Sequence, residues 1–170
     1  MPFDPFKFLR KLEDKSPQLS RNLTMAFLNK LSPFNGHLGA KLIEWNDDKA
    51  LIFVKKKRGV QNHVKSIHAG ALFTLGETCA GLVIIRNFPF EKFRPLMSDV
   101  RVTYSKQARG DVWGEAIAQP GVIEKAHEVF NSGEVPIIEM TTNIMNDQKE
   151  IIAVVTSIWQ VKPWNLVRTK

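Results

Sequence analysis

The sequence predicts an α+β fold in which a curved antiparallel β-sheet wraps one long central helix, with extra helices at the N-terminus. Six short segments have the residue patterns of strands, and short turns rich in Asn and Asp join two pairs of them into antiparallel neighbours. A single long helical segment interrupts the series. It contains three glycines, each costing roughly 1 kcal/mol of helix propensity, so we expect close packing on the sheet to offset the loss.

Two helices are predicted ahead of the sheet. Asp4-Pro5 and Ser16-Pro17 each place a capping residue before a proline at the first helical position. Both segments then show apolar residues at helical spacing, and the second is expected to end before Pro33.

The six predicted strands are Leu38–Trp45, Ala50–Lys55, Pro95–Ser105, Val112–Ala118, Val135–Met145 and Ile151–Val161. Asn46-Asp47-Asp48 and Asn146-Asp147-Gln148 are the predicted turns. The sixth strand is apolar on both faces, as is typical of a strand inside a sheet.

The long helix is predicted over His68–Asn87, between the second and third strands. Pro120–Gly133 is predicted as an inserted loop with one helical turn around Ile123–Phe130. One half-buried face of the third strand is expected to contain Leu96, Val100, Val102 and Tyr104.

Length and composition fit one domain. We expect it to span residues 1–170, with an N-terminal helical extension over 1–33 and the core over 34–163. Hydrophobic residues make up 44% and charged residues 24%, which excludes a disordered chain. The single cysteine, Cys79, is expected to be a buried, reduced thiol. No signal peptide or membrane span is recognisable, so we expect a cytoplasmic protein.

The start of the long helix is the main candidate for chemistry. Its unpaired N–H groups and the positive end of its dipole would stabilise a carbonyl oxygen that gains negative charge, which indicates acyl chemistry. Glu77 shares an apolar stripe with Phe73, where an unpaired carboxylate has a raised pKa useful to a general base. Alternatively, Glu77 is structural and pairs with Arg101 or Lys106.

These residues fall into a known pattern. Asn62, His68-Ala69-Gly70 and Glu77 have the register of a motif in hotdog-fold thioesterases of the phenylacetate-pathway type. The segment Ser98–Tyr104 resembles the third strand of that family. The resemblance covers about Leu38–Val161 and is strongest to an uncharacterised branch known only as a domain of unknown function.

The resemblance implies a hotdog fold and an acyl-CoA thioesterase that works as a homodimer, which could pair further into a dimer of dimers. Ala69 N–H, with Gly70 N–H, would hold the thioester oxygen, Asn62 would assist, and His68 would fix the local geometry. The partner's Glu77 would activate water beside a substrate that contacts Phe73. No metal or cofactor is implied.

Two departures from the family pattern stand out. Ala69 replaces a glycine of the motif, which narrows the mouth of the site. A serine that helps to place the water in some relatives would fall near Met97, whereas Ser98 is one position off and faces the other side of the strand.

Two other functions remain open. In hotdog dehydratases a catalytic His precedes a helical Glu by fourteen residues, and His63 and Glu77 have that separation, although the prolines of the dehydratase loop are absent. The second alternative is a non-catalytic module that binds acyl groups or CoA.

The net charge of +7 favours anionic partners. Lys56, Lys57 and Arg58 lead into the loop with Asn62, so we expect them to bind the phosphates of CoA, with a solvated turn as the alternative. Nucleic acid is not expected, because no aromatic-rich strand motif accompanies the basic run.

Overall fold

The structure is a computed structural model that describes residues 5–167, with side chains from Phe8 onward. The helices are α1 (Pro5–Glu13), α2 (Pro17–Leu31), α3 (Pro33–Gly36), α4 (Ala69–Asn87) and α5 (Val122–Asn131), with 3₁₀ turns η1 (Arg58–Val60) and η2 (Trp164–Leu166). The strands are β1 (Lys41–Trp45), β2 (Lys49–Val54), β3 (Phe93–Tyr104), β4 (Val112–Ile117), β5 (Ile137–Met145) and β6 (Ile151–Pro163).

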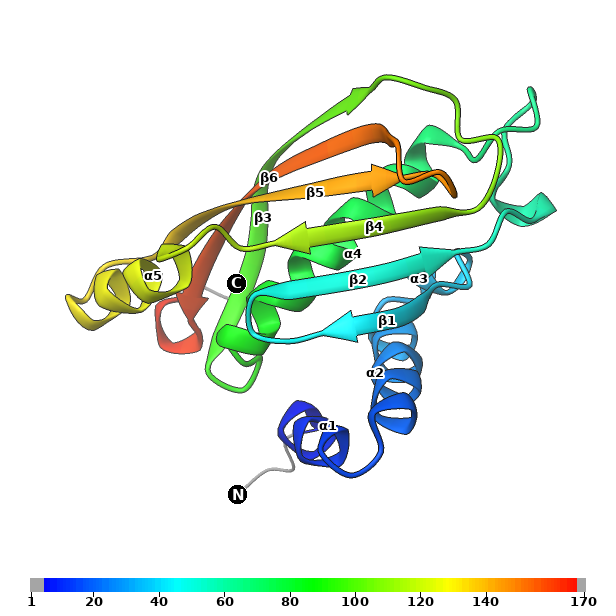
Figure 1. The fold of residues 1–170 in the computed structure, drawn as a ribbon. Helices are drawn as coiled ribbons and strands as arrows, with labels where there is room; N and C mark the ends of the chain where they lie inside the picture. Colours follow the sequence, from blue (N-terminus) through cyan, green and yellow to red (C-terminus); the bar gives the residue numbers. More distant parts are fainter. Residues whose placement is uncertain (1–4, 168–170) are drawn as a thin grey trace.

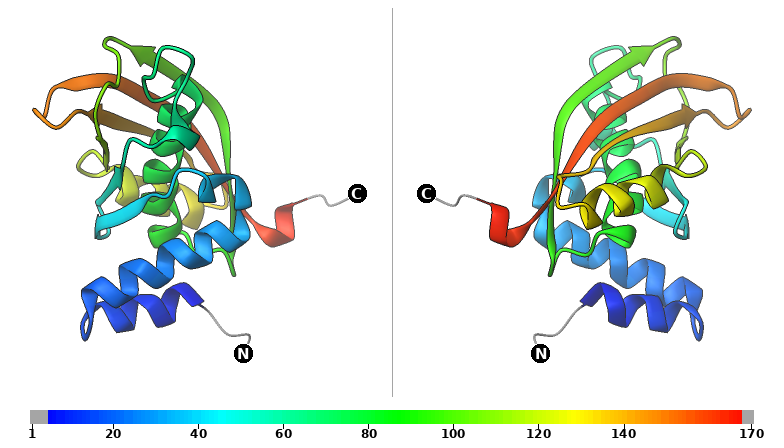
Figure 2. Two further views of the ribbon diagram at one scale, coloured as in Figure 1. Left: turned by 90° about the vertical axis from the view of Figure 1, so that its right-hand side faces the viewer. Right: turned by 90° about the vertical axis from the view of Figure 1, so that its left-hand side faces the viewer.

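The six strands form one antiparallel sheet in the order β1-β2-β4-β5-β6-β3. The sheet curves around α4, which lies along its inner face (Figure 1). Viewed from either side, the long strands β3 and β6 bend over this helix (Figure 2). The predicted α+β arrangement is confirmed, and β6 has a neighbour on each side as predicted. β1 and β3 are the two edges of the sheet.

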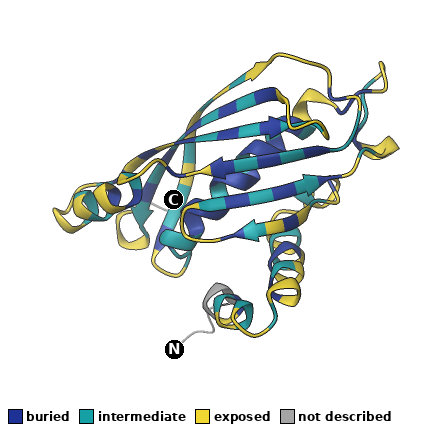
Figure 3. Ribbon diagram, in the orientation of Figure 1, coloured by how far each residue is buried: buried dark blue, intermediate teal, exposed yellow. Residues whose placement is uncertain are grey.

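The core forms between α4 and the inner face of the sheet, where buried positions alternate along the strands (Figure 3). α4 buries Leu72, Leu75, Cys79 and Leu82 there. Gly76 explains how the helix approaches so closely: a Cβ at this position would overlap the side chain of Val155 on β6. Gly76 therefore lowers the helix propensity of α4 but allows the helix to contact the sheet closely.

The N-terminal helices pack beside this core. Both begin at the predicted prolines, although Asp4 lies outside the described residues and the Ser16 side chain makes no capping hydrogen bond. The fixed φ of proline, rather than a side-chain cap, is what marks the start of α2. α2 ends at Leu31, before Pro33 as predicted, and Pro33 starts the additional short helix α3.

Two sequence-based expectations are wrong in detail. The inserted segment contains a helix of ten residues, α5, rather than one turn, because Ile123 and Ala126 share a buried face. In β3 the register with β6 shifts between Met97 and Asp99. This bulge turns Leu96 outward, where it is 45% exposed, so Leu96 does not share a face with the partly buried Val100.

Among the described residues, one helix is long and apolar enough to cross a membrane, namely α4. Most of α4 is buried inside the protein under the sheet. Such burial is typical of a core helix, which can be as long and as apolar as a membrane-spanning helix.

Candidate active site

His68 caps the start of α4. Its Nδ1 accepts a hydrogen bond from Gly70 N–H at 2.9 Å, and its own N–H donates to Val60 O at 2.8 Å. Since an accepting imidazole nitrogen has no proton, the ring proton is on Nε2. These contacts order the start of α4 around His68, and Gly70 N–H is already donated within the chain.

Ala69 N–H is the remaining donor of the first turn. The two amides that follow Gly70, those of Ala71 and Leu72, both donate to His68 O. Within residues 5–167 no atom accepts a hydrogen bond from Ala69 N–H, and Ala69 is exposed. This amide therefore lies at the positive end of the helix dipole with its hydrogen bond still to be made, so it is a candidate donor to a substrate oxygen.

Asn62 orders the loop that precedes α4. Its Oδ1 accepts hydrogen bonds from Val64 N–H and Ser66 N–H, both at 3.1 Å. Its backbone N–H donates to Ser66 O, and Lys65 adopts a left-handed φ of 59° within the turn. The structure thus shows Asn62 as a turn residue, and its Nδ2 group is what the side chain can offer to a ligand.

Tyr104 is a contributor that sequence reasoning did not single out. From the end of β3 its hydroxyl donates a hydrogen bond to Ala69 O at 3.1 Å. Partial burial raises the pKa of the Tyr104 hydroxyl, which keeps it a donor. Through this contact the edge strand β3 fixes the position of the first turn of α4. In the sequence, the signal for this role was the place of Tyr104 at the end of the Ser98–Tyr104 segment.

Glu77 lies two turns further along α4 and has no partner charge. Within the described residues no hydrogen bond or ion pair involves its carboxylate, and burial raises its pKa. Lys106 instead pairs with Glu150 at 2.8 Å. The alternative of a structural Glu77 paired with Arg101 or Lys106 is therefore wrong within the described residues, and Glu77 is a partly buried carboxylate with a raised pKa.

A cavity of about 180 Å³ opens beside Glu77. Its walls come from α4, from the N-terminal helices and from the β6–β3 edge, through Leu28, Asn35, Trp159 and Pro95 among others. Asn35 Nδ2 donates to Thr78 Oγ1 at 3.2 Å, which attaches the N-terminal wall to α4. The N-terminal wall was not predicted, because it depends on contacts between segments far apart in the sequence.

Glu77 and Ala69 N–H are too far apart to act on one atom. They are eight residues apart in one helix, which is about 12 Å at 1.5 Å per residue. A thioester carbon has to lie within about 3.5 Å of its nucleophile and its oxygen beside the donor. One chain therefore holds two halves of a possible site rather than a whole one.

The basic run lies close to the helix start. Arg58 begins η1, and the last residue of that turn, Val60, receives the His68 N–H. Lys57 is exposed, whereas Lys56 is partly buried and its Nζ donates to Arg109 O at 2.8 Å. His63 is exposed on the same loop, and Phe73 is partly buried one turn before Glu77.

The expected departure on the third strand is present. Ser98 is exposed at the β3 bulge, and its hydroxyl donates to Ile158 O at 3.2 Å. Met97 is the partly buried residue next to it. A serine hydroxyl is thus not placed beside Glu77 by β3.

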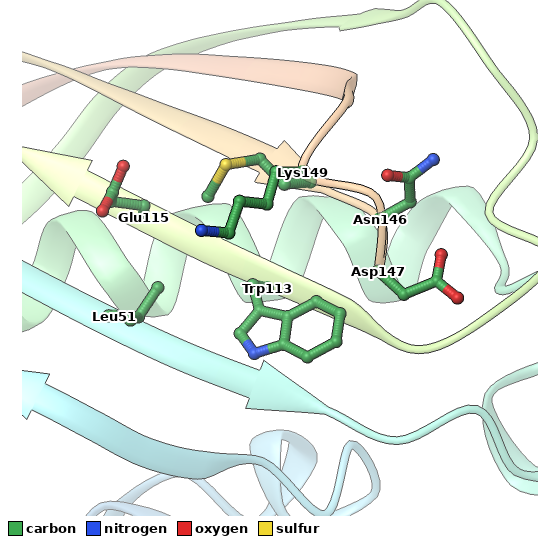
Figure 4. Close-up of a pocket in the computed structure, with 7 residues that line it drawn as sticks. Leu51, Trp113, Glu115, Asn146, Asp147 and Lys149 are labelled. Carbon is green, nitrogen blue, oxygen red and sulfur yellow. The ribbon is translucent and has the colours of Figure 1, made fainter.

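A second cavity, of about 480 Å³, lies on the outer face of the sheet and is separate from this site (Figure 4). Trp113 and Lys149 point into it, between Glu115 and Asp147. The strands separate it from α4, so it contains none of the predicted site residues. Within residues 5–167, no three His, Cys, Asp or Glu side chains converge as a metal site.

Comparisons with known proteins identify the family. A protein-family model described as "Domain of unknown function (DUF4442)" matches residues 20–161. No curated protein sequence matches the chain. The matched range includes the long helix and strands β1 to β5 in full, together with most of β6 and of α2.

Solved structures share the fold. A Pseudomonas aeruginosa protein of unknown function, described as a probable thioesterase, superposes with a TM-score of 0.75 at 22% identity and covers 86% of this chain and 95% of its own. A mutant of a Staphylococcus aureus thioesterase gives 0.63 at 20% identity, covering 78% of this chain and 100% of its own. A hypothetical thioesterase from Streptococcus pneumoniae gives 0.56 at 16%, covering 73% and 90%. The chain belongs to the DUF4442 family and has the hotdog fold of thioesterase-like proteins.

Proposed function

We propose that the protein is a cytoplasmic acyl-CoA thioesterase that works as a homodimer. The observation that carries the proposal is the unpaired Glu77 carboxylate beside a mostly apolar cavity, in the helix whose first N–H, Ala69, has no acceptor within the described residues. The names of the similar structures agree with this chemistry.

The reaction is a hydrolysis in two steps. The Glu77 carboxylate takes a proton from a water molecule as its oxygen attacks the thioester carbon. The negative charge that develops on the carbonyl oxygen is stabilised by Ala69 N–H at the start of α4. Collapse of the intermediate breaks the C–S bond, and the leaving thiolate takes the proton from Glu77.

The separation of about 12 Å between these groups requires two chains, with Ala69 from one and Glu77 from the other. β3 ends the sheet as an edge strand, and an open edge can pair with the same strand of a second copy. Such a dimer contains two equivalent sites.

The basic run supports CoA as the carrier. Exposed Lys57 and Arg58 lie near the helix start, where they attract nucleotide phosphates without being buried.

A non-catalytic acyl-binding protein is the second candidate. Two observations favour it: Gly70 N–H is already donated to His68, and β3 supplies no serine near Glu77. In this case the cavity binds the same acyl group without turnover. A dehydratase that uses His63 as its catalytic residue is the third candidate function. The variant His63→Ala distinguishes it from a thioesterase: a thioesterase stays active, whereas a dehydratase loses its activity toward 3-hydroxyacyl thioesters.

The decisive experiment is a hydrolysis screen over acyl-CoA chain lengths with two single variants. Glu77→Ala removes the base. Ala69→Pro removes one N–H at the first helical position, where proline is tolerated and where His68 already has the extended ψ of 140° that a following proline prefers. Both are expected to fold, to dimerise, and to lose about a hundredfold or more in kcat.

Mixing the two inactive variants tests the shared site. In a mixed dimer one site contains both mutations and the other contains neither, so an equal mixture should recover about a quarter of wild-type activity. The matched control is a mixture of Glu77→Ala with a Glu77→Ala, Ala69→Pro double variant, which has no intact site. Wild-type turnover by Glu77→Ala would refute the mechanism, and no recovery on mixing would refute the two-chain site.

A further inference from the structure

We propose that the cavity beside Glu77 selects short acyl groups of about six non-hydrogen atoms, and that the N-terminal helices impose this limit. The inference rests on the proposed function for the identity of the reaction, but its test below does not need turnover. Neither the fold nor the family assigns an acyl length.

The cavity has a direction. Glu77, Gly81 and Ile85 recur at four-residue spacing along one face of α4, so the lining follows this face from the carboxylate toward the end of the helix. Phe90, beyond the end of α4, also lines it. The thioester is expected at the Glu77 end, with the acyl tail directed toward Phe90.

The polarity of the cavity lining changes along the same direction, from polar near Glu77 to apolar near Phe90. Polar groups gather next to Glu77, where Thr78 accepts the hydrogen bond from Asn35. Ile85 and Phe90, further along, are apolar. A thioester has a polar end at the reacting carbon and an apolar tail, so this gradient matches an acyl group that enters tail first.

The volume sets the length. An engineered apolar cavity of about 150 Å³ in another protein binds one benzene molecule, which has six carbons. The cavity here measures about 180 Å³ and therefore holds an acyl group of similar size. The methylenes of a longer acyl chain would extend beyond the cavity into solvent, where they add no apolar contact.

Trp159 makes one wall rigid. It is 7% exposed, and its indole N–H donates to Ser157 Oγ at 2.8 Å. A Cβ at position 81 would lie 3.3 Å from the edge of the Trp159 ring, so this ring occupies the space that Gly81 leaves open. Because packing and a hydrogen bond both fix the ring, the cavity cannot lengthen on this side.

The opposite wall is the adjustable one. Leu28 on α2 lines the cavity and is only partly buried. Leu28→Ala removes three carbons from the wall without emptying the core. It should therefore admit an acyl tail that is longer by about three carbons.

The test measures binding of S-alkyl-CoA thioethers, which cannot be hydrolysed, from two to sixteen carbons by calorimetry. For the wild type we expect affinity to rise about fourfold per methylene, at 0.8 kcal/mol each, and to stop rising near six carbons. Leu28→Ala should move this limit by about three carbons. Leu23→Ala, on the same helix but outside the cavity, should not. Gly81→Ala should shorten the limit, because the added methyl group takes up space beside the fixed Trp159 ring.

Two results would overturn the inference: affinity that keeps rising to twelve carbons in the wild type, or equal limits in Leu28→Ala and Leu23→Ala. The same alkyl series on pantetheine, without the nucleotide, should show the same limit, and loss of the limit there would assign selectivity to the carrier instead. Length-limited binding without any thioester hydrolysis would refute only the proposed function. Hydrolysis at rates indifferent to length would refute only this inference.

Discussion

Replacing Glu77 with Gln should abolish activity and stabilise the protein at neutral pH. Burial raises the pKa of the Glu77 carboxyl above its usual 4.5, and among the described residues no cation lies near enough to offset this effect. The folded state therefore keeps the proton at pH values where the unfolded state has lost it. The free energy of unfolding of the wild type therefore falls as the pH rises from about 4.5 through the raised pKa. Above this window the ionised carboxylate lowers the free energy of unfolding by a constant amount.

The size of each effect follows from these surroundings. Loss of a general base lowers kcat by about 10² to 10⁴ fold. Glu77 is only partly buried, so solvent screening limits the gain in unfolding free energy at pH 7 to about 1 kcal/mol at most. For a chain of 170 residues this corresponds to about 2–4 °C in Tm.

The assay is thermal unfolding of wild type and Glu77→Gln between pH 4 and pH 8, alongside hydrolysis of one active acyl-CoA. The difference in Tm should be present at pH 8 and vanish toward pH 4, where wild-type Glu77 is protonated. Glu139→Gln, an exposed glutamate on β5, is the control and should leave both quantities unchanged. A Glu77→Gln variant that is less stable at every pH would refute the reasoning, because it would mean that the carboxylate is structurally paired.

Three further outcomes can be measured. Gly76→Ala should lower the unfolding free energy by about 1–2 kcal/mol in urea, since overpacking against Val155 outweighs the gain in helix propensity, and Val155→Ala in the same chain should restore part of it; a more stable Gly76→Ala would contradict this. Arg86→Met should cost about 2 kcal/mol, mainly by leaving the Glu13 carboxylate, which is 20% exposed, without its partner, and an unchanged Tm would show that the pair contributes nothing. Neutralising Lys57 and Arg58 should raise KM for acyl-CoA at low salt with kcat unchanged; an unchanged KM would exclude the phosphate contact.

Local sequence signals were sufficient for most of the fold. Proline positions marked the starts of α1 and α2, and the Asn46 and Asn146 side chains accept backbone N–H groups within the two predicted turns. Both signals act over a few residues, which is why they can be read without the structure. The β3 bulge could not be predicted, because it arises from the register with β6.

The site was predictable only in part, because some of its contacts join segments that are far apart in the sequence. The spacing of His68 and Glu77 fixed their places on one helix, and the capping contact of His68 followed from its position at the helix start. Tyr104 reaches that helix start from a strand 35 residues later, and the N-terminal wall reaches Thr78 from Asn35. No periodicity or motif encodes such distant contacts.

The N-terminal wall depends in turn on the far end of α4. Arg86, in the last turn of α4, forms ion pairs with Glu13 on α1 at 2.9 Å and with Asp47 in the β1–β2 turn at 2.7 Å. α1 then holds α2, because Ser20 Oγ donates to Leu9 O at 2.6 Å within a buried contact. These ion pairs thus help to hold α2, and with it the cavity wall, in addition to the contact between Asn35 and Thr78. If the proposed length limit is correct, Arg86→Met should relax the limit as well as lower Tm, whereas a stability-matched core variant on the opposite side of α4 should lower Tm alone.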